Sequence, residues 1–262
     1  MTPEPDADPP SAGLPPAPAE TPPDSASGRV PLTARVVALL EVLLCSDYPT
    51  QAALSATFAA SGFAPYGANG QLRPGFVATL SLVDTTLLVG LIWFFLAAHG
   101  ERPRDVFLGP RPPLREASLG VPLIVVALAI AMVIIVGVQQ LAPSLHNVTN
   151  NPLQELIRRP EDIWLFAAVV VIAGGTREEL QRAFLLHRLE HWLGGATMGL
   201  IVANLAFGAG HLLQGVDAAI ATATLGVFWG IVYLRRRSAI APIVSHSGFN
   251  LMQIVQFLIV GR

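Results

Sequence analysis

The chain is poor in residues on which several common protein classes depend. It has a single cysteine, Cys45, no lysine, a charged fraction of only 13% and a formal net charge of -2. One cysteine excludes an intrachain disulfide, and without closely spaced Cys or His residues it excludes a zinc ribbon. All the basic side chains are arginines and they are balanced by acids, which leaves no electrostatic footprint for nucleic acid. We therefore expect no nucleic-acid partner.

Apolar residues, in contrast, are abundant. They make up 52% of the chain, a composition typical of membrane proteins. A helix needs ~20 mostly apolar residues to cross the hydrocarbon layer. Seven runs of about this length occur, near residues 34–60, 76–98, 117–141, 160–193, 196–214, 217–234 and 239–260. The sequence predicts an all-α fold, a polytopic membrane bundle of about seven transmembrane helices over residues 31–262, embedded in the lipid bilayer.

The first thirty residues have a different character. Residues 1–30 are rich in proline, alanine, serine and acids, a mixture that buries too little apolar surface to offset the entropy of ordering. We expect a disordered tail. Its acidic, proline-rich start lacks the basic stretch and apolar run of a secretory signal peptide.

Arginines in the short loops predict the orientation. Arg235, Arg236 and Arg237 lie between the last two apolar runs, and short arginine-rich loops remain on the cytoplasmic side. Residues 101–115 and the tail lie on the same side by the number of crossings. We expect a multi-pass protein of the cell membrane with a cytoplasmic N-terminus.

Charged and polar side chains lie inside several of the apolar runs. An ionisable group inside a membrane helix is costly, so it is a functional-site hypothesis by default. With ~1.5 Å of rise per residue, groups on the runs 160–193, 196–214 and 239–260 fall at overlapping depths and can line one polar cavity. Glu178 and Arg182 also lie one helical turn apart, where they can pair. The candidate site residues are Glu178, Glu179, Arg182, His211, His246 and Asn250.

This set of side chains suits the hydrolysis of a peptide bond. A buried carboxylate can take a proton from water, while His and Asn can stabilise the oxyanion. Glu178, His211 and His246 could instead hold Zn²⁺ or another divalent metal with one position open for water. The HExxH motif and the GxSG serine motif are both absent. The residues themselves leave the metal-dependent and the metal-free mechanism open.

At these residues the chain resembles the CAAX-protease and bacteriocin-processing family of intramembrane metalloproteases, which is related to the eukaryotic prenyl-protein endopeptidases. The likeness covers about residues 160–256. Members carry a Glu-Glu pair with a nearby Arg, then a Phe with a His four residues on, then a His with an Asn four residues on. Phe207 with His211, and His246 with Asn250, match the second and third patterns.

The first pattern departs from the family. Its usual form is Glu-Glu-x-x-x-Arg, whereas only two residues separate Glu179 from Arg182 here. If the Glu pair is aligned, Glu178 is the catalytic base and Arg182 is displaced around the helix. If the spacing of one helical turn between Glu and Arg is aligned instead, Glu178 corresponds to the second Glu of the family pair, and Arg177 occupies the position of the first Glu. We favour Glu178 as the base over Glu179.

The resemblance implies an intramembrane endopeptidase that cuts a membrane-associated or lipid-anchored protein or peptide. Prenylated CAAX proteins are the substrates of the eukaryotic members. The alternative is a non-catalytic membrane scaffold or a small transporter that uses the same buried charges. Glu41, Asp84 and Asn204 are expected to form hydrogen bonds between helices, and Arg188 is expected to extend to the membrane interface.

Overall fold

The computed structural model describes residues 30–68, 70–148, 156–160 and 162–260. These residues form helices and one isolated bridge between Tyr66 and Leu72. The predicted all-α class is therefore confirmed. Residues Pro31–Arg262 form one compact unit, and the predicted disordered tail 1–30 lies, except for Val30, outside the described residues.

The first predicted span is wrong in detail because the run 34–60 is divided into two helices. Helix α1 covers Leu32–Leu44 and α2 covers Tyr48–Ala60. Asp47 between them has a φ of 80°, and Pro49 follows in the first turn of α2, where its missing N–H costs no helical hydrogen bond. At ~1.5 Å per residue, neither helix of 13 residues spans the hydrocarbon layer by itself.

The longest apolar runs form continuous helices. Helix α3 covers Pro74–Ala98 and α5 covers Pro113–Leu141, with the short α4 at Pro103–Phe107 between them and a 3-10 turn at Pro143–Leu145 after them. Helix α9 covers Val216–Arg236. By length and composition, α3, α5 and α9 can each cross a membrane. A helical polytopic membrane bundle is thus present, while the number of seven crossings stays a prediction.

The predicted helix 160–193 is continuous but changes its winding in the middle. It consists of α6 at Asp162–Val169, a π-helical segment at Val170–Arg177 and α7 at Glu178–Trp192. π-Helical turns are rare and occur often at functional sites. This segment ends immediately before the Glu-Glu pair, so the altered winding sets the direction in which both carboxylates leave the helix.

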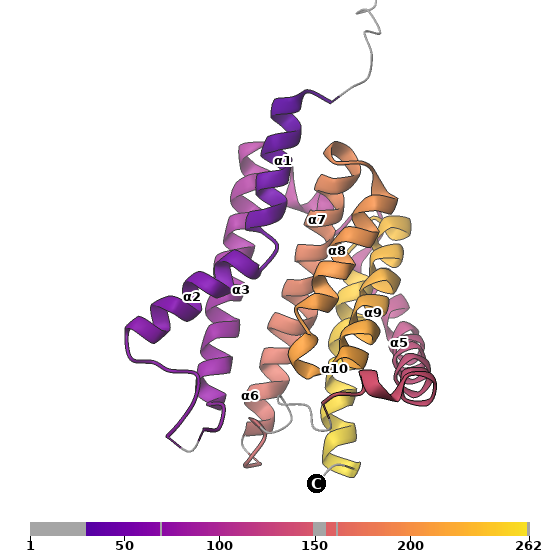
Figure 1. The fold of residues 1–262 in the computed structure, drawn as a ribbon. Coiled ribbons are helices and arrows are strands. Elements are labelled where there is room, and N and C mark those ends of the chain that lie inside the picture. The colour runs from indigo at the N-terminus through magenta and orange to yellow at the C-terminus, as the bar shows by residue number, and fades with distance from the viewer. Residues whose placement is uncertain (1–29, 69, 149–155, 161, 261–262) are drawn as a thin grey trace, which may run out of the picture. The chain divides into compact units, whose positions relative to one another are not determined.

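The C-terminal helices pack around this segment. Helix α8 covers Ala196–Ala209, a 3-10 turn covers Leu212–Gln214, and α10 covers Ile240–Val260. Helix α8 packs on α7 and α9, and α10 packs on α5 and on the π-helical segment. Helices α7 to α10 lie side by side in Figure 1.

Glycines permit the closest of these helix contacts. A Cβ at Gly174 would lie 2.7 Å from Nδ2 of Asn250 on α10, and a Cβ at Gly175 would overlap Ser247, which is also on α10. Because small residues let helix backbones approach each other, α10 can lie directly against the π-helical segment. This approach places the polar residues of α10 next to the start of α7.

Candidate active site

His246 lies between the two adjacent carboxylates of α7. Its Nδ1 is 2.8 Å from Glu179 Oε1, and its Nε2 is 3.8 Å from Glu178 Oε2. The imidazole also stacks on the indole of Trp229, with ring centroids 3.9 Å apart. The structure thus brings together α7 and α10 at Glu178, Glu179 and His246, as the depths along the helices predict.

Glu179 is held from two sides. Arg182, one turn further along α7, donates to Glu179 Oε1, the same oxygen that faces His246 Nδ1. Arg182 Nε donates to Asn204 Oδ1 on α8 over 3.2 Å, and its guanidinium lies 4.5 Å from the centre of the Phe207 ring. Asn204 therefore joins two helices, as predicted. This chain of contacts fixes both the Glu179 carboxylate and the orientation of the His246 ring.

The expected pairing of Glu178 with Arg182 is wrong. Arg182 pairs with Glu179, three residues before it, and Glu178 instead lies 3.7 Å from Arg177 Nη2. The Glu178 side chain keeps 14% of its surface exposed, compared with 1% for Glu179. Glu178 has only long contacts with charged partners among the described residues, which leaves its carboxylate freer than that of Glu179 to act on a small molecule such as water.

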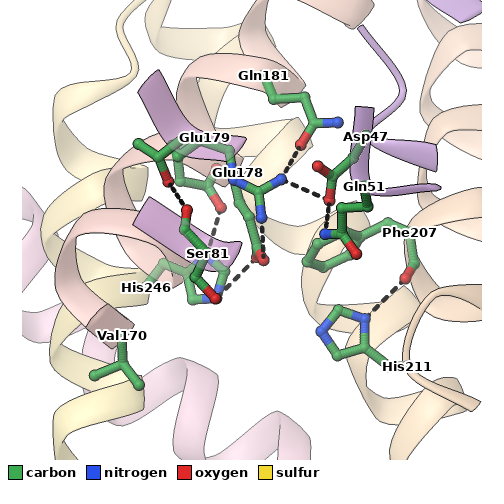
Figure 2. A network of polar contacts seen from close by, with 12 residues as sticks. Asp47, Gln51, Ser81, Val170, Glu178, Glu179, Gln181, Phe207, His211 and His246 are labelled. Atoms are coloured by element: carbon green, nitrogen blue, oxygen red, sulfur yellow. Dashed lines mark hydrogen bonds and ion pairs between the residues drawn. The ribbon is translucent and has the colours of Figure 1, made fainter. Parts of the chain in front are cut away.

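His211 lies next to Phe207 at the end of α8. Its Nδ1 is 2.9 Å from the Phe207 carbonyl oxygen, and the two rings are 4.8 Å apart. Since a carbonyl oxygen can only accept a hydrogen bond, Nδ1 carries the proton and Nε2 of the neutral ring has a free lone pair. Figure 2 shows His211 on the Phe207 side of the cluster, and Phe207 in turn lies 6.5 Å from His246 between ring centres.

Asn250 lies one turn beyond His246 on α10, where its Nδ2 donates to the Val170 carbonyl oxygen over 3.4 Å. Val170 is the first residue of the π-helical segment, so the amide contacts the backbone of this segment. Asn250 thus lies against the segment that precedes Glu178, while no described contact joins it to either carboxylate.

The tentative metal set is not assembled as a ligand group. In the described ranges, no three or more His, Cys, Asp or Glu side chains lie close enough together to hold a metal ion. His246 has Glu179 at one nitrogen, and His211 lies beyond Phe207. These donors therefore do not fit a three-ligand centre.

Sequence reasoning overlooked the neighbours of Arg177. This buried guanidinium lies 2.8 Å from Asp47 Oδ2 and donates to Gln181 Oε1 over 3.1 Å. Asp47 comes from the junction of α1 and α2, and Figure 2 shows it on the side of Glu178 away from His246. The available signal was Asp47 itself, a charge within an apolar run.

Comparison with known proteins gives one match. The model of the family "Type II CAAX prenyl endopeptidase Rce1-like" matches residues 159–252. This range contains all six candidate site residues, and the match confirms the resemblance seen in the sequence. It points to a CAAX-type intramembrane protease. No curated protein and no solved structure matches the chain.

Proposed function

We propose that the protein is an intramembrane endopeptidase in which Glu178 activates water to hydrolyse a peptide bond. One observation carries the proposal: within the segment matched by the protease family, Glu178 and His246 face each other across 3.8 Å. Two polar atoms separated by more than ~3.5 Å can share a bridging water. Glu179 and Arg182 hold the His246 ring in place.

In the proposed reaction, the water oxygen attacks the scissile carbonyl carbon as Glu178 takes one of the water protons. A carboxylate placed within hydrogen-bond reach suits this role of general base. The C–N bond of the tetrahedral intermediate then breaks, and the protonated Glu178 returns its proton to the leaving amine. Atoms and charges balance without another reactant.

The remaining site residues serve the same two steps. With Nδ1 protonated toward Glu179, the neutral His246 has an acceptor at Nε2 that can orient the second water proton. His211 Nε2 can accept a proton in the same way, and only in its charged form can it donate to an oxyanion. Asn250 has an amide N–H₂ that can donate to the oxyanion when substrate displaces its weak bond to Val170.

The substrate class proposed is a membrane-associated or lipid-anchored protein or peptide. The three helices α3, α5 and α9, which can each cross a membrane, support a site within a bilayer, where a soluble protein would reach it only with difficulty. We further propose a cell-membrane location with the N-terminus and the loop Arg235–Arg237 in the cytoplasm. Reporter fusions within the loop 143–160 test this orientation, and cytoplasmic reporters there would contradict it.

The proposed chemistry is tested with a library of membrane-tethered reporters exposed to the full-length protein in proteoliposomes. Glu178→Gln keeps the size of the side chain but removes the base, so cleavage should fall by about 10²- to 10⁴-fold, the range typical of general-base catalysis. Glu179→Gln should cost less, because it leaves the base in place. All variants are compared at equal amounts of folded protein.

Two outcomes would favour a different catalytic base or a different function. A Glu178→Gln protein that cuts as well as the parent would remove Glu178 from the mechanism and move the assignment to Glu179. A parent protein that cuts no reporter, together with variants that alter only stability, would favour the scaffold. Direct titration with Zn²⁺, compared between the parent and a His211→Ala variant, tests separately whether a metal is bound.

A further inference from the structure

Asp47 lies at a strained corner of the backbone. It joins α1 to α2 with φ 80° and ψ -31°, and Arg237 is the other described non-glycine residue with a positive φ. This conformation is unfavourable for a residue with a Cβ and costs of the order of 1–3 kcal/mol. Glycine would adopt it freely. An aspartate at such a position suggests that its side chain has a role.

The side chain of Asp47 reaches the helix that carries the carboxylates. Its Oδ2 lies 2.8 Å from Arg177 Nη1. Arg177 is only 5% exposed and also donates to Gln181, whose Nε2 donates to the Cys45 carbonyl oxygen over 2.9 Å. The corner between α1 and α2 is therefore linked twice to the start of α7, although it lies outside the matched range 159–252.

Arg177 lies closer to Asp47 than to Glu178. Arg177 approaches Asp47 to 2.8 Å but Glu178 only to 3.7 Å. Since a guanidinium prefers close, bidentate contact with a carboxylate, an Arg177 released from Asp47 would move onto its neighbour Glu178. Such a contact would occupy the oxygens that must receive the water proton.

We propose that Asp47 is a positioning residue that holds Arg177 away from Glu178 and so keeps the Glu178 carboxylate available as a base. The inference rests on the proposed role of Glu178. Beside Arg177 and Asp47, the charged groups that act on Glu178 are Arg182 on its own helix and His246 on α10. Asp84 on α3 acts on Arg177. Of these acids, Asp47 has the shortest described contact with Arg177.

The first experiment compares Asp47→Asn with Asp47→Glu in the full-length protein in proteoliposomes. Asp47→Asn should lower kcat about tenfold, because a Glu178 carboxylate paired with Arg177 is a poorer general base. KM should stay within about twofold, since Asp47 acts through Arg177 and not on substrate. The acidic limb of the pH–rate profile should move to lower pH. Asp47→Glu restores the charge and should recover most of the rate.

The matched control is Glu116→Gln. Like Asp47, Glu116 is an acid paired with an arginine, with its Oε1 2.5 Å from Arg236 Nη2. It is fully buried, whereas the Asp47 side chain is 20% exposed, and no described contact joins Glu116 to the site. It should change neither kcat per folded molecule nor the pH profile. In an Arg177→Gln background, Asp47→Asn should add less than about twofold, because its route to Glu178 is already removed.

Parental kcat and pH profile in Asp47→Asn would overturn the proposal, as would equal losses in Asp47→Asn and Glu116→Gln. If the parent protein cuts no reporter, the proposed function fails, and the positioning role is then tested without catalysis. Carboxyl ¹³C NMR in detergent follows Glu178, assigned by the resonance lost in Glu178→Gln. Asp47→Asn should move its titration midpoint to lower pH and Glu116→Gln should not; an unmoved midpoint overturns the inference.

Discussion

Helix α7 carries two buried arginine clusters that differ in how completely their acids are satisfied. Near its C-terminal end, Arg188 binds Glu41 Oε2 over 2.5 Å and both oxygens of Glu101 over 2.7 and 2.8 Å. His99 Nε2 lies 2.6 Å from the remaining oxygen of Glu41. Near its N-terminal end, Glu179 is bound tightly, but the ion pairs of Glu178 within the described residues are long, at 3.7 Å to Arg177 and 3.8 Å to His246.

The difference separates a structural cluster from a reactive one. In the Arg188 cluster, every carboxylate oxygen has a close partner, so the group joins α1, α7 and the residue after α3 and has no free acceptor. Around Glu178 one carboxylate lacks such partners, although it lies beside a fully paired one. Desolvated charges are costly unless paired, and a buried acid with only long contacts to charged groups, beside a fully paired one, is therefore a candidate for a reaction centre.

The largest effect should come from comparing the two histidines that contact glutamates. His246→Ala removes the ring between Glu178 and Glu179 and should lower cleavage by about 10²-fold or more. His99→Ala removes a similar contact from Glu41 and should change the rate per folded molecule by less than about threefold. Reporter cleavage in proteoliposomes measures both; equal losses would mean that the clusters do not differ in function.

The next effect concerns stability. Arg188→Ala strands the buried Glu41, and removing one partner of a buried pair costs about 3–5 kcal/mol. The folded fraction should nevertheless keep its rate. Arg182→Ala should also destabilise the protein by stranding Glu179, yet its folded fraction should lose activity because the His246 ring is no longer held. Unfolding by SDS in mixed micelles, combined with cleavage per folded molecule, separates the two.

A smaller effect is expected at the contact between helices that supports the reactive cluster. Gly175→Ala introduces a Cβ that overlaps Ser247, and overpacking of this kind costs about 1–3 kcal/mol. It should also displace α10, and with it His246, so activity should fall as well. Gly137→Ala in α5, where a Cβ would meet nothing within 4 Å, is the control and should lower neither stability nor rate.

The smallest effect should come from an exposed ion pair on α7. Glu190 contacts Arg237, with a hydrogen bond of 2.6 Å from Nη2, but the Arg237 side chain is 47% exposed. Exposed pairs contribute ~0–1 kcal/mol. Glu190→Gln should therefore change stability by less than about 1 kcal/mol and activity by less than twofold in the same assays. A larger loss would show that pairing, not burial, governs the effects.

The apolar runs predict most of the helices, but not their interruptions. Helices α3, α5, α9 and α10 follow the predicted ranges closely, because a long apolar segment has few alternatives to a helix in lipid. The run 34–60 predicts a single span, because composition does not reveal the positive φ of Asp47 that divides it. The π-helical winding before Glu178 is equally invisible, because it depends on packing against α10.

The candidate site was predictable along the helix axes but not across them. Depth alone placed His246, Glu178 and Glu179 at overlapping levels, and the structure brings the three side chains together. It could not place His211, which lies beyond Phe207, because depth contains no lateral information. Arg188 was expected at the membrane interface, yet it is 1% exposed; its partner acids lie in distant parts of the chain, and sequence spacing does not show which helices become neighbours.

The π-helical segment determines how α7 is rotated about its own axis, and both arginine clusters lie on α7. Restoring ordinary α winding over Val170–Arg177 at unchanged length would turn everything beyond this segment relative to α6, because each residue of an α-helix advances the winding by ~100° and each residue of a π-helix advances it by less. Glu178 and Arg188 would then leave their partners together, since both are fixed to the same rigid helix. The π-helical segment therefore fixes the rotation of α7 about its axis. The reactive carboxylate and the structural arginine can be correctly oriented only at the same time.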